Sequence, residues 1–290
     1  MSFQGKTAVI TGGASGMGYL CGECLAKEGA NIVLVDIDEE RLRGCVERIK
    51  AAAGHDRVLG CAIDIRQYDK VVQVRKAAVD AFGSVDILIN CAGGASTRVL
   101  NVHAEFKDLP IEVIDWGIDV NLKGALYFDH AMLDQMAKQN SGVIIHLGSI
   151  TGEEGCAVNV DYAASKSALM YGVTKSLALY GAQYNVRVCC VSPGPVLTRP
   201  GMAGMKTLQG RAAQPQEIVD LILYLCSDKA AFITGTNYLI DGGRNVMRNK
   251  EENHESEQAH VSWAFPPAAH LHGAGGEPHR RHQHRAQRGL

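Results

Sequence analysis

The chain has 290 residues, a formal net charge of −2 and 46% hydrophobic residues. This length suggests one or two domains with a core that needs neither disulfides nor metals, and the near-neutral charge excludes a strongly basic nucleic-acid-binding protein. No apolar run approaches the roughly 20 residues of a membrane helix, and residues 1–6 lack the apolar core of a signal peptide. We therefore expect a cytoplasmic protein without a membrane or nucleic-acid partner.

Apolar strands alternate with amphipathic helices along residues 1–244. Because the strands are continuously apolar, the sheet must be covered by helices on both faces, which is typical of a doubly wound parallel α/β (Rossmann) fold. The carboxyl ends of the strands then share one edge, where ligands bind. In chain order we expect strand 6–11, helix 16–28, strand 31–36, helix 39–53, strand 57–63, helix 68–82, strand 85–90, helix 111–138, strand 142–148, helix 161–184, strand 186–191, helix 216–227 and strand 237–240.

The composition changes near residue 245. Residues 245–290 contain seven of the 11 histidines, clustered arginines and a Pro-Pro pair, with no helical or strand period. Such a segment buries too little apolar surface to offset the entropy of ordering. We expect a single dehydrogenase-like domain at 1–244 and a low-complexity tail that is disordered or non-native.

The nine cysteines are scattered, and their odd number does not suggest a disulfide framework. Cys21 and Cys24 have the spacing of a metal or redox pair, but no second pair accompanies them and they fall within an expected helix. We interpret the cysteines as packing residues in a reducing compartment and predict no metal site.

A glycine-rich turn follows the first strand. Gly12, Gly16 and Gly18 lie between this strand and the next helix, where only glycine lets the backbone approach a pyrophosphate closely. An acidic residue about 20 positions further on completes the dinucleotide-binding pattern. That residue is Asp36, at the end of the second strand.

Asp36 favours NAD over NADP. Its carboxylate can accept hydrogen bonds from the ribose hydroxyls, whereas a 2′-phosphate about 4 Å away would cost on the order of 4 kcal/mol at an effective dielectric of about 20. Ile37 and Asp38 follow, and neither compensates for a phosphate. The alternative is that Asp36 only caps a strand or helix.

Tyr162 and Lys166 are separated by four positions in an expected helix, so they share one face. A free tyrosine is a poor base at neutral pH, but a neighbouring ammonium stabilises the phenolate. The pair is therefore a candidate proton donor and acceptor for an alcohol or carbonyl oxygen. The alternative for such a common spacing is an ordinary helix surface.

Further motifs follow the glycine loop in order along the chain. The whole set, over about residues 4–243, resembles the compact, one-domain branch of the short-chain dehydrogenase/reductase family. Cys91 departs from the family's pattern, which has a second asparagine there. The matching elements besides the glycine loop and the Tyr-Lys pair are Asp64, Asn90-Cys91-Ala92-Gly93, Asn121, Ser149 thirteen residues before Tyr162, and Pro193-Gly194 with Thr198.

The resemblance implies hydride transfer at a nicotinamide, with four catalytic residues. Tyr162 would exchange the proton of the alcohol, and Ser149 would hydrogen-bond the substrate oxygen. Lys166 would support the tyrosine and hold the nicotinamide ribose, and Asn121 would support a water that relays protons. Taken singly, Asn121 is also explained as a helix kink and Ser149 as a strand-end cap.

The resemblance also implies a set of cofactor contacts. Asp64 would contact the adenine, Asn90 would tie neighbouring strands near the cofactor, and the loop to Thr198 would hold the nicotinamide carboxamide. The expected cofactor-binding residues are Gly12, Ser15, Gly16, Met17, Gly18, Asp36, Asp64, Ile65, Asn90, Ala92, Gly93, Tyr162, Lys166, Pro193, Gly194, Val196 and Thr198.

The substrate is less well defined, and polyols or sugars, hydroxysteroids and 3-oxoacyl thioesters stay open. A short lid between Thr198 and Pro215 favours a small alcohol or ketone. Glu153 and Glu154 would disfavour an anionic substrate if they faced the pocket, although solvated loop charges are the more common explanation. Candidate substrate contacts are Gly94, Ser96, Thr151, Asn159 and Pro195.

Two other functions remain as alternatives. One is a catalytically silent, NAD-binding regulatory or scaffold protein, although such a protein would be expected to lose part of the four-residue set. The other is a sugar-nucleotide epimerase, which needs a larger C-terminal domain than residues 245–290 supply. The family resemblance also implies a homotetramer, and a monomer in light scattering would contradict it.

Overall fold

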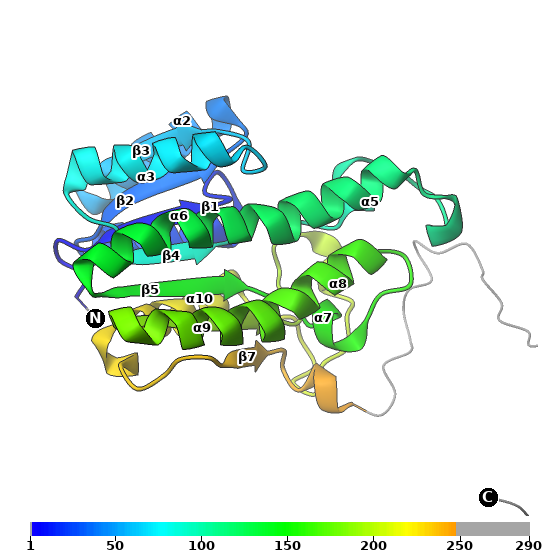
Figure 1. Cartoon of the computed structure of the whole chain (residues 1–290). Helices are drawn as coiled ribbons and strands as arrows, with labels where there is room; N and C mark the ends of the chain where they lie inside the picture. Colours follow the sequence, from blue (N-terminus) through cyan, green and yellow to red (C-terminus); the bar gives the residue numbers. More distant parts are fainter. Residues whose placement is uncertain (1, 248–290) are drawn as a thin grey trace, which may run out of the picture. The chain divides into compact units, whose positions relative to one another are not determined.

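The structure is a computed structural model and describes residues 2–247. The predicted tail lies outside the described residues from position 248 onward. Seven strands form one parallel sheet in the order β3-β2-β1-β4-β5-β6-β7, which confirms the doubly wound α/β fold (Figure 1). The strands are β1 (Thr7–Thr11), β2 (Asn31–Asp36), β3 (Val58–Ala62), β4 (Ile87–Asn90), β5 (Gly142–Leu147), β6 (Val186–Pro193) and β7 (Asn237–Ile240).

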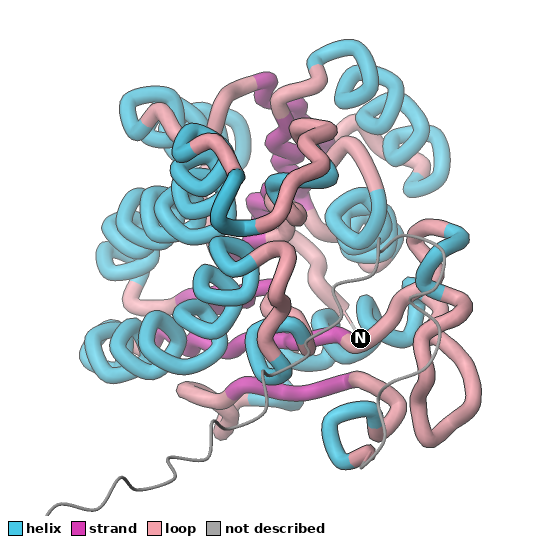
Figure 2. Tube along the Cα trace, turned by 90° about the vertical axis from the view of Figure 1, so that its right-hand side faces the viewer, coloured by secondary structure: helices cyan, strands magenta, loops and turns pink. Residues whose placement is uncertain are grey.

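Alternate side chains of each strand point to opposite faces, and each face has its own apolar cluster. In β1, Ala8 and Ile10 belong to one cluster and Val9 to the other. Figures 1 and 2 show the helices on both sides of the sheet. The first cluster includes side chains from α1 (Gly16–Lys27), α2 (Glu39–Ala53) and α10 (Pro215–Cys226), and the second from α3 (Tyr68–Phe82), α6 (Gly124–Gln139) and α9 (Thr174–Gly181).

Both long helices contain a π-helical segment that the sequence period did not predict. The expected helix 111–138 consists of α5 (Ile111–Ile118), the π segment η2 (Asp119–Lys123) and α6. The expected helix 161–184 consists of α8 (Val160–Ala168), the π segment η3 (Leu169–Val173), α9 and the 3-10 turn η4 (Ala182–Tyr184). Such segments are rare and occur frequently at functional sites.

Short helical turns in the connections were also not predicted. They contain only three or four residues each, too few for a periodic pattern. The short turns are α4 (Ser96–Val99), η1 (Phe106–Asp108), α7 (Thr151–Glu154), η5 (Pro200–Met202), η6 (Asp228–Ala230) and η7 (Arg244–Val246).

No helix among residues 2–247 is long and apolar enough to cross a membrane.

All nine cysteines are free. Cys21, Cys45 and Cys189 belong to the first apolar cluster, as expected of packing residues. Burial raises the pKa of Cys190 to about 11, so this thiol stays protonated at neutral pH. Within residues 2–247, no group of three or more His, Cys, Asp or Glu side chains is arranged to hold a metal ion.

A buried polar network connects the sheet to both long helices. Asp129 on α6 and His146 on β5 are 1% and 0% exposed, and His146 Nε2 lies 3.0 Å from Asp129 Oδ2. Asn90 donates to Asp129 Oδ1 at 2.8 Å, so its side chain links β4 to α6 instead of linking neighbouring strands as expected. His146 Nδ1 lies 2.9 Å from Thr174 Oγ1, which itself donates to the carbonyl of Leu169 at 2.6 Å. His146 therefore links Asp129 on α6 to Thr174 on α9 through its two ring nitrogens.

We predict that Asp129→Ala destabilises the protein by about 3–5 kcal/mol, because it leaves the buried imidazole ring without its anionic acceptor. Asp134→Ala on the same helix is the control, since Asp134 forms only solvent-exposed ion pairs with Arg75 and Lys138 and should cost less than about 1 kcal/mol. Urea denaturation at a fixed protein concentration measures both. Equal losses in the two variants would contradict a special role for the buried pair.

Candidate functional site

The loop after β1 is built from glycines that no other residue could replace. Gly12 has a φ of +68°, and a Cβ built on it would lie 2.9 Å from the amide nitrogen of Ala92. A Cβ on Gly18 would lie 2.4 Å from the carbonyl oxygen of Gly12. Ser15, which precedes α1, makes no side-chain cap, so the first-turn N–H groups remain available to an anion. The loop therefore fits the pyrophosphate of a dinucleotide.

Asp36 lies beside this loop at the end of β2, and its carboxylate is fixed in place. It accepts hydrogen bonds from the backbone amides of Ala14 (3.0 Å), Ile37 (2.8 Å) and Asp38 (3.2 Å). A carboxylate offers about four acceptor positions, so one remains for a ribose hydroxyl. Asp36 thus has the capping role considered as the alternative and still presents a negative charge at this edge.

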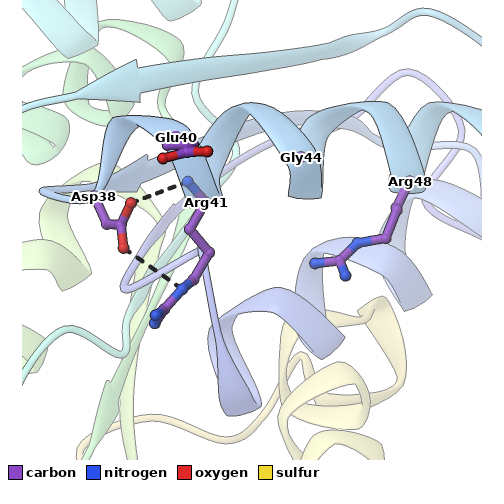
Figure 3. Close-up of a pocket in the computed structure, with 5 residues that line it drawn as sticks. All are labelled: Asp38, Glu40, Arg41, Gly44 and Arg48. Atoms are coloured by element: carbon purple, nitrogen blue, oxygen red, sulfur yellow. Dashed lines mark hydrogen bonds and ion pairs between the residues drawn. The ribbon is translucent and has the colours of Figure 1, made fainter.

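The first turn of α2 carries a basic residue that the sequence interpretation overlooked. Arg41 faces Asp38, with its Nε 3.5 Å from Asp38 Oδ2, at an open depression along the helix (Figure 3). Glu40, Gly44 and Arg48 also line this depression. In this structure the charge of Arg41 is paired with Asp38 at an exposed position.

Asp64 follows β3 and is clamped by Arg66. Arg66 Nε donates to both carboxylate oxygens at 3.0 Å, and Arg66 Nη2 donates to Oδ2 at 2.6 Å. The Arg66 side chain, through these hydrogen bonds, holds the pKa of Asp64 below its usual range. Asp64 is therefore an ionised acceptor that is suited to an exocyclic amino group.

The loop after β4 is held by two neighbouring elements. Thr11 Oγ1 accepts from the amides of Cys91 (3.1 Å) and Ala92 (3.0 Å). Asn121 lies in the π segment η2, and its Oδ1 accepts from the Gly94 amide at 2.8 Å. Asn121 Nδ2 donates to the carbonyls of Gly94 and Gly117 at 3.0 and 2.9 Å. The side chain of Asn121 is thus fully engaged in backbone contacts.

Lys166 brings the remaining predicted catalytic residues together. It is 3% exposed, and its Nζ lies 5.6 Å from the ring centroid of Tyr162. Nζ donates to the carbonyl of Leu147 at 2.7 Å, and Ser149 follows Leu147 by two residues at the end of β5. A Cβ built on Gly93 would lie 2.4 Å from Asn121 Oδ1 and 3.7 Å from Lys166 Nζ. The side chains of Asn121, Tyr162 and Lys166 therefore converge at the carboxyl edge of the sheet, where Ser149 also lies.

The turn after β6 also lies at the carboxyl edge of the sheet. Gly194 donates to the carbonyl of Ile240 at 3.0 Å, and a Cβ on Gly194 would lie 2.7 Å from the Cα of Asp241. Val196 is buried and bridges to Ala213, while Thr198 is exposed. The turn therefore has a fixed start at Gly194 and an exposed end at Thr198.

The structure gives contacts for three of the five candidate substrate residues. Gly94 lies next to Asn121, and Asn159 accepts from Thr97 Oγ1 at 2.5 Å. Thr151 donates its amide to Ser149 Oγ at 3.1 Å. The remaining two candidates do not line an open surface: Pro195 is buried, and Ser96 is 0% exposed with its Oγ unpartnered.

The two acidic residues after Ser149 have partners elsewhere. Glu154 Oε2 accepts from Arg244 Nε at 3.1 Å, and both side chains are largely buried. Glu153 accepts a hydrogen bond from the hydroxyl of Tyr171. Besides Lys166, two further cations, Arg98 and Arg199, lie at this edge, and the sequence did not reveal them because a single arginine in a surface turn has no distinguishing pattern.

Comparison with known proteins agrees with this geometry. Residues 12–245 match the family model described as enoyl-(acyl carrier protein) reductase. A trans-4-hydroxycyclohexanecarboxylate dehydrogenase from Sinomonas cyclohexanicum is 36% identical over 253 residues, which cover 84% of this chain and 94% of the relative. The chain belongs to the short-chain dehydrogenase/reductase family. It is therefore an oxidoreductase that acts on alcohols or ketones, as the sequence resemblance implied.

Other members of the short-chain dehydrogenase/reductase family show similar coverage. An NAD-dependent glycerol dehydrogenase from Listeria innocua is 34% identical over 251 residues, which cover 83% of this chain and 94% of the relative. The crystal structure of an NAD⁺-bound xylitol dehydrogenase has a TM-score of 0.75 at 26% identity and covers 84% of this chain and 100% of its own. A nicotinamide dinucleotide is the cofactor typical of this family.

We predict that Gly18→Ala weakens dinucleotide binding at least tenfold, because the added methyl group would clash with the Gly12 carbonyl and open the loop. Gly44→Ala is the matched control, since a Cβ at Gly44 on α2 meets no atom within 4 Å. It should leave binding unchanged and stabilise the helix by about 0.5–1 kcal/mol. Fluorescence titration with NADH measures the affinity, and equal affinities in the two variants would contradict the role of the loop.

Proposed function

We propose that the protein is an NAD-dependent oxidoreductase that transfers a hydride between the cofactor and a secondary alcohol or ketone, with Tyr162 as acid and base. The position of Lys166 carries this proposal. Its buried ammonium lies beside the Tyr162 ring and is anchored at the strand end that leads to Ser149. A cation held in this way stabilises the phenolate form that the proton transfer requires.

The reaction divides among four side chains. The bound nicotinamide supplies the hydride acceptor for oxidation and the hydride donor for reduction. Tyr162 takes the alcohol proton during oxidation and returns it during reduction, while Ser149 Oγ donates a hydrogen bond to the substrate oxygen. Lys166 uses one of its three donors on Leu147 and keeps two for the tyrosine oxygen and a ribose hydroxyl. Asn121 fixes the Gly94 backbone, so a proton-relay water would be held by main-chain atoms near it.

The fixed carboxylate of Asp36 supports NAD as the preferred cofactor. Three backbone amides prevent Asp36 from turning away, so a 2′-phosphate at the ribose would face its charge directly. The other predicted contacts would hold the cofactor as the family does: the glycine loop at the pyrophosphate, Asp64 at the adenine, and the turn from Pro193 to Thr198 at the carboxamide.

The relatives are named for both small and large substrates. Some names give hydroxycyclohexanecarboxylate, glycerol or xylitol, whereas others give a 3-oxoacyl-carrier-protein or a succinyl-CoA thioester. A small alcohol or ketone is our first choice over a hydroxysteroid or a 3-oxoacyl thioester because the segment between Thr198 and Pro215 is short. We also propose a homotetramer as in the family, and exposed apolar residues such as Leu179 and Phe232 are candidates for its interfaces. A catalytically silent NAD-binding protein is the alternative that the following experiment distinguishes.

We predict that Tyr162→Phe lowers kcat by at least about 100-fold, because it removes the group that exchanges the proton. The affinity for NAD should stay nearly unchanged. Tyr171→Phe is the control, since this tyrosine on the same long helix donates its hydroxyl to Glu153 instead. Turnover is followed by NADH absorbance across polyols, hydroxysteroids and hydroxyacyl thioesters. Near-normal activity of Tyr162→Phe would overturn the assignment, and an inactive wild type would favour the silent binding protein.

We predict that the wild type prefers NAD to NADP in kcat/KM and that Asp36→Asn raises the NADP-to-NAD ratio at least tenfold. The substitution removes the negative charge and keeps the size of the side chain. Glu40→Gln, an exposed position on the first turn of α2 (Figure 3), should leave the ratio near the wild-type value. A wild type that prefers NADP would contradict the proposal.

A further inference from the structure

Two arginines lie at the carboxyl edge of the sheet, where Tyr162 also lies, and have no role in the proposed proton transfer. Arg98 belongs to the short helix α4, and Arg199 directly precedes the turn η5. They come from different loops, one after β4 and one after β6, that meet at the carboxyl edge of the sheet. Their side chains are therefore placed where a substrate would approach Tyr162.

The guanidinium of Arg98 folds back over the loop after β4. A Cβ built on Gly94 would lie 2.7 Å from Arg98 Nη2, so the charged group rests on the bare Cα of this glycine. The Gly94 backbone is bonded on both its amide and its carbonyl to Asn121. Arg98 is thus directed toward the predicted catalytic residues although it belongs to an exposed turn.

The two arginines are also close enough to influence each other. Partial burial lowers the pKa of Arg98 most, the neighbouring charge of Arg199 lowers it further, and Tyr162 acts in the opposite direction. The charges of Arg98, Arg199 and Tyr162 therefore belong to one electrostatic neighbourhood. Like charges at close range repel each other, so this arrangement is more favourable with an anion between them.

Within residues 2–247, no carboxylate forms an ion pair with either arginine. Arg199 Nη2 lies 3.8 Å from the sulfur of Met202, which is a weak acceptor. Three acidic residues of the adjoining segments are paired with other groups: Glu154 with Arg244, Glu153 with Tyr171, and Glu217 with Arg211. Asp161, which precedes Tyr162, is buried with both carboxylate oxygens unpartnered and forms no ion pair with Arg98 or Arg199. Within the described residues, both guanidinium groups are therefore without a carboxylate partner.

We propose that Arg98 and Arg199 bind an anionic group of the substrate, a carboxylate or a phosphate ester, remote from the carbon that exchanges the hydride. This inference rests on the proposed function, because it assigns a charge to the substrate of the same site. A guanidinium presents donors in a planar fork that matches the oxygens of either anion. Glu153 and Glu154 would have disfavoured an anionic substrate only if they faced the site, and both bond to other groups.

Binding of simple anions tests the proposal without requiring turnover. NADH-saturated protein is titrated calorimetrically with benzoate, phenyl phosphate and the neutral isostere benzamide. We expect at least one anion to bind at least tenfold more tightly than benzamide, and the tighter of the two identifies the group as carboxylate or phosphate. If benzamide binds as tightly as both anions, or if no anion binds, the proposal is overturned.

Arginine variants test whether Arg98 and Arg199 are the residues that bind the anion. Arg98→Gln and Arg199→Gln should each weaken the preferred anion at least fivefold, whereas Arg43→Gln, an exposed arginine on α2, should not change it. A loss of NADH affinity by the same factor would mean that the arginines serve the cofactor and would overturn the proposal, as would unchanged anion binding. Because Tyr162→Phe should bind the anion normally, a failure of this proposal is distinguishable from a failure of the proposed function.

Discussion

The buried contact between Asp129 and His146 is the interaction on which the rest of the site depends. It joins β5, which leads to Ser149, to the helix that follows Asn121, and through Thr174 it reaches the long helix that carries Tyr162 and Lys166. A buried hydrogen-bonded pair tolerates little displacement, because moving either partner leaves polar atoms of the other without a partner away from water. The sheet and both long helices are therefore locked in one register behind the cofactor edge.

The sequence predicted the regular strands and helices but not the π-helical segments beside this network. Strands β2 and β7 and helices α2 and α3 match the expected bounds, because continuous apolar runs and amphipathic periods carry the signal for them. The π segments were not predictable from periodicity. Beside η3, for example, the Thr174 hydroxyl bonds to Leu169, and a single hydroxyl leaves no mark on the apolar period. Of the buried network, the sequence shows only His146 as unusual, because it is a polar residue inside an otherwise apolar strand.

The predicted site residues were found by motif, and motifs report chemistry that is local in sequence. Tyr162 and Lys166 share a helix face, so their proximity follows from spacing alone. Arg98 and Arg199 are about a hundred positions apart and meet only because the loops after β4 and β6 converge. The charge around the site is a tertiary property, so the sequence left open whether Glu153 and Glu154 face it, and the structure directs both toward other partners.

Gly94 contacts both a residue found by motif, Asn121, and a residue that only the fold brings near, Arg98. Its backbone is held on both sides by Asn121, and its missing side chain makes room for the guanidinium of Arg98. Any rearrangement of the η2 π segment would therefore move the loop that supports Arg98 together with the residue that borders Lys166. An anion bound at the arginines would in turn restrain this loop, because it would draw the two flanking segments together. If the arginines bind the substrate as proposed, substrate charge and the geometry of proton transfer would thus be coupled through Gly94.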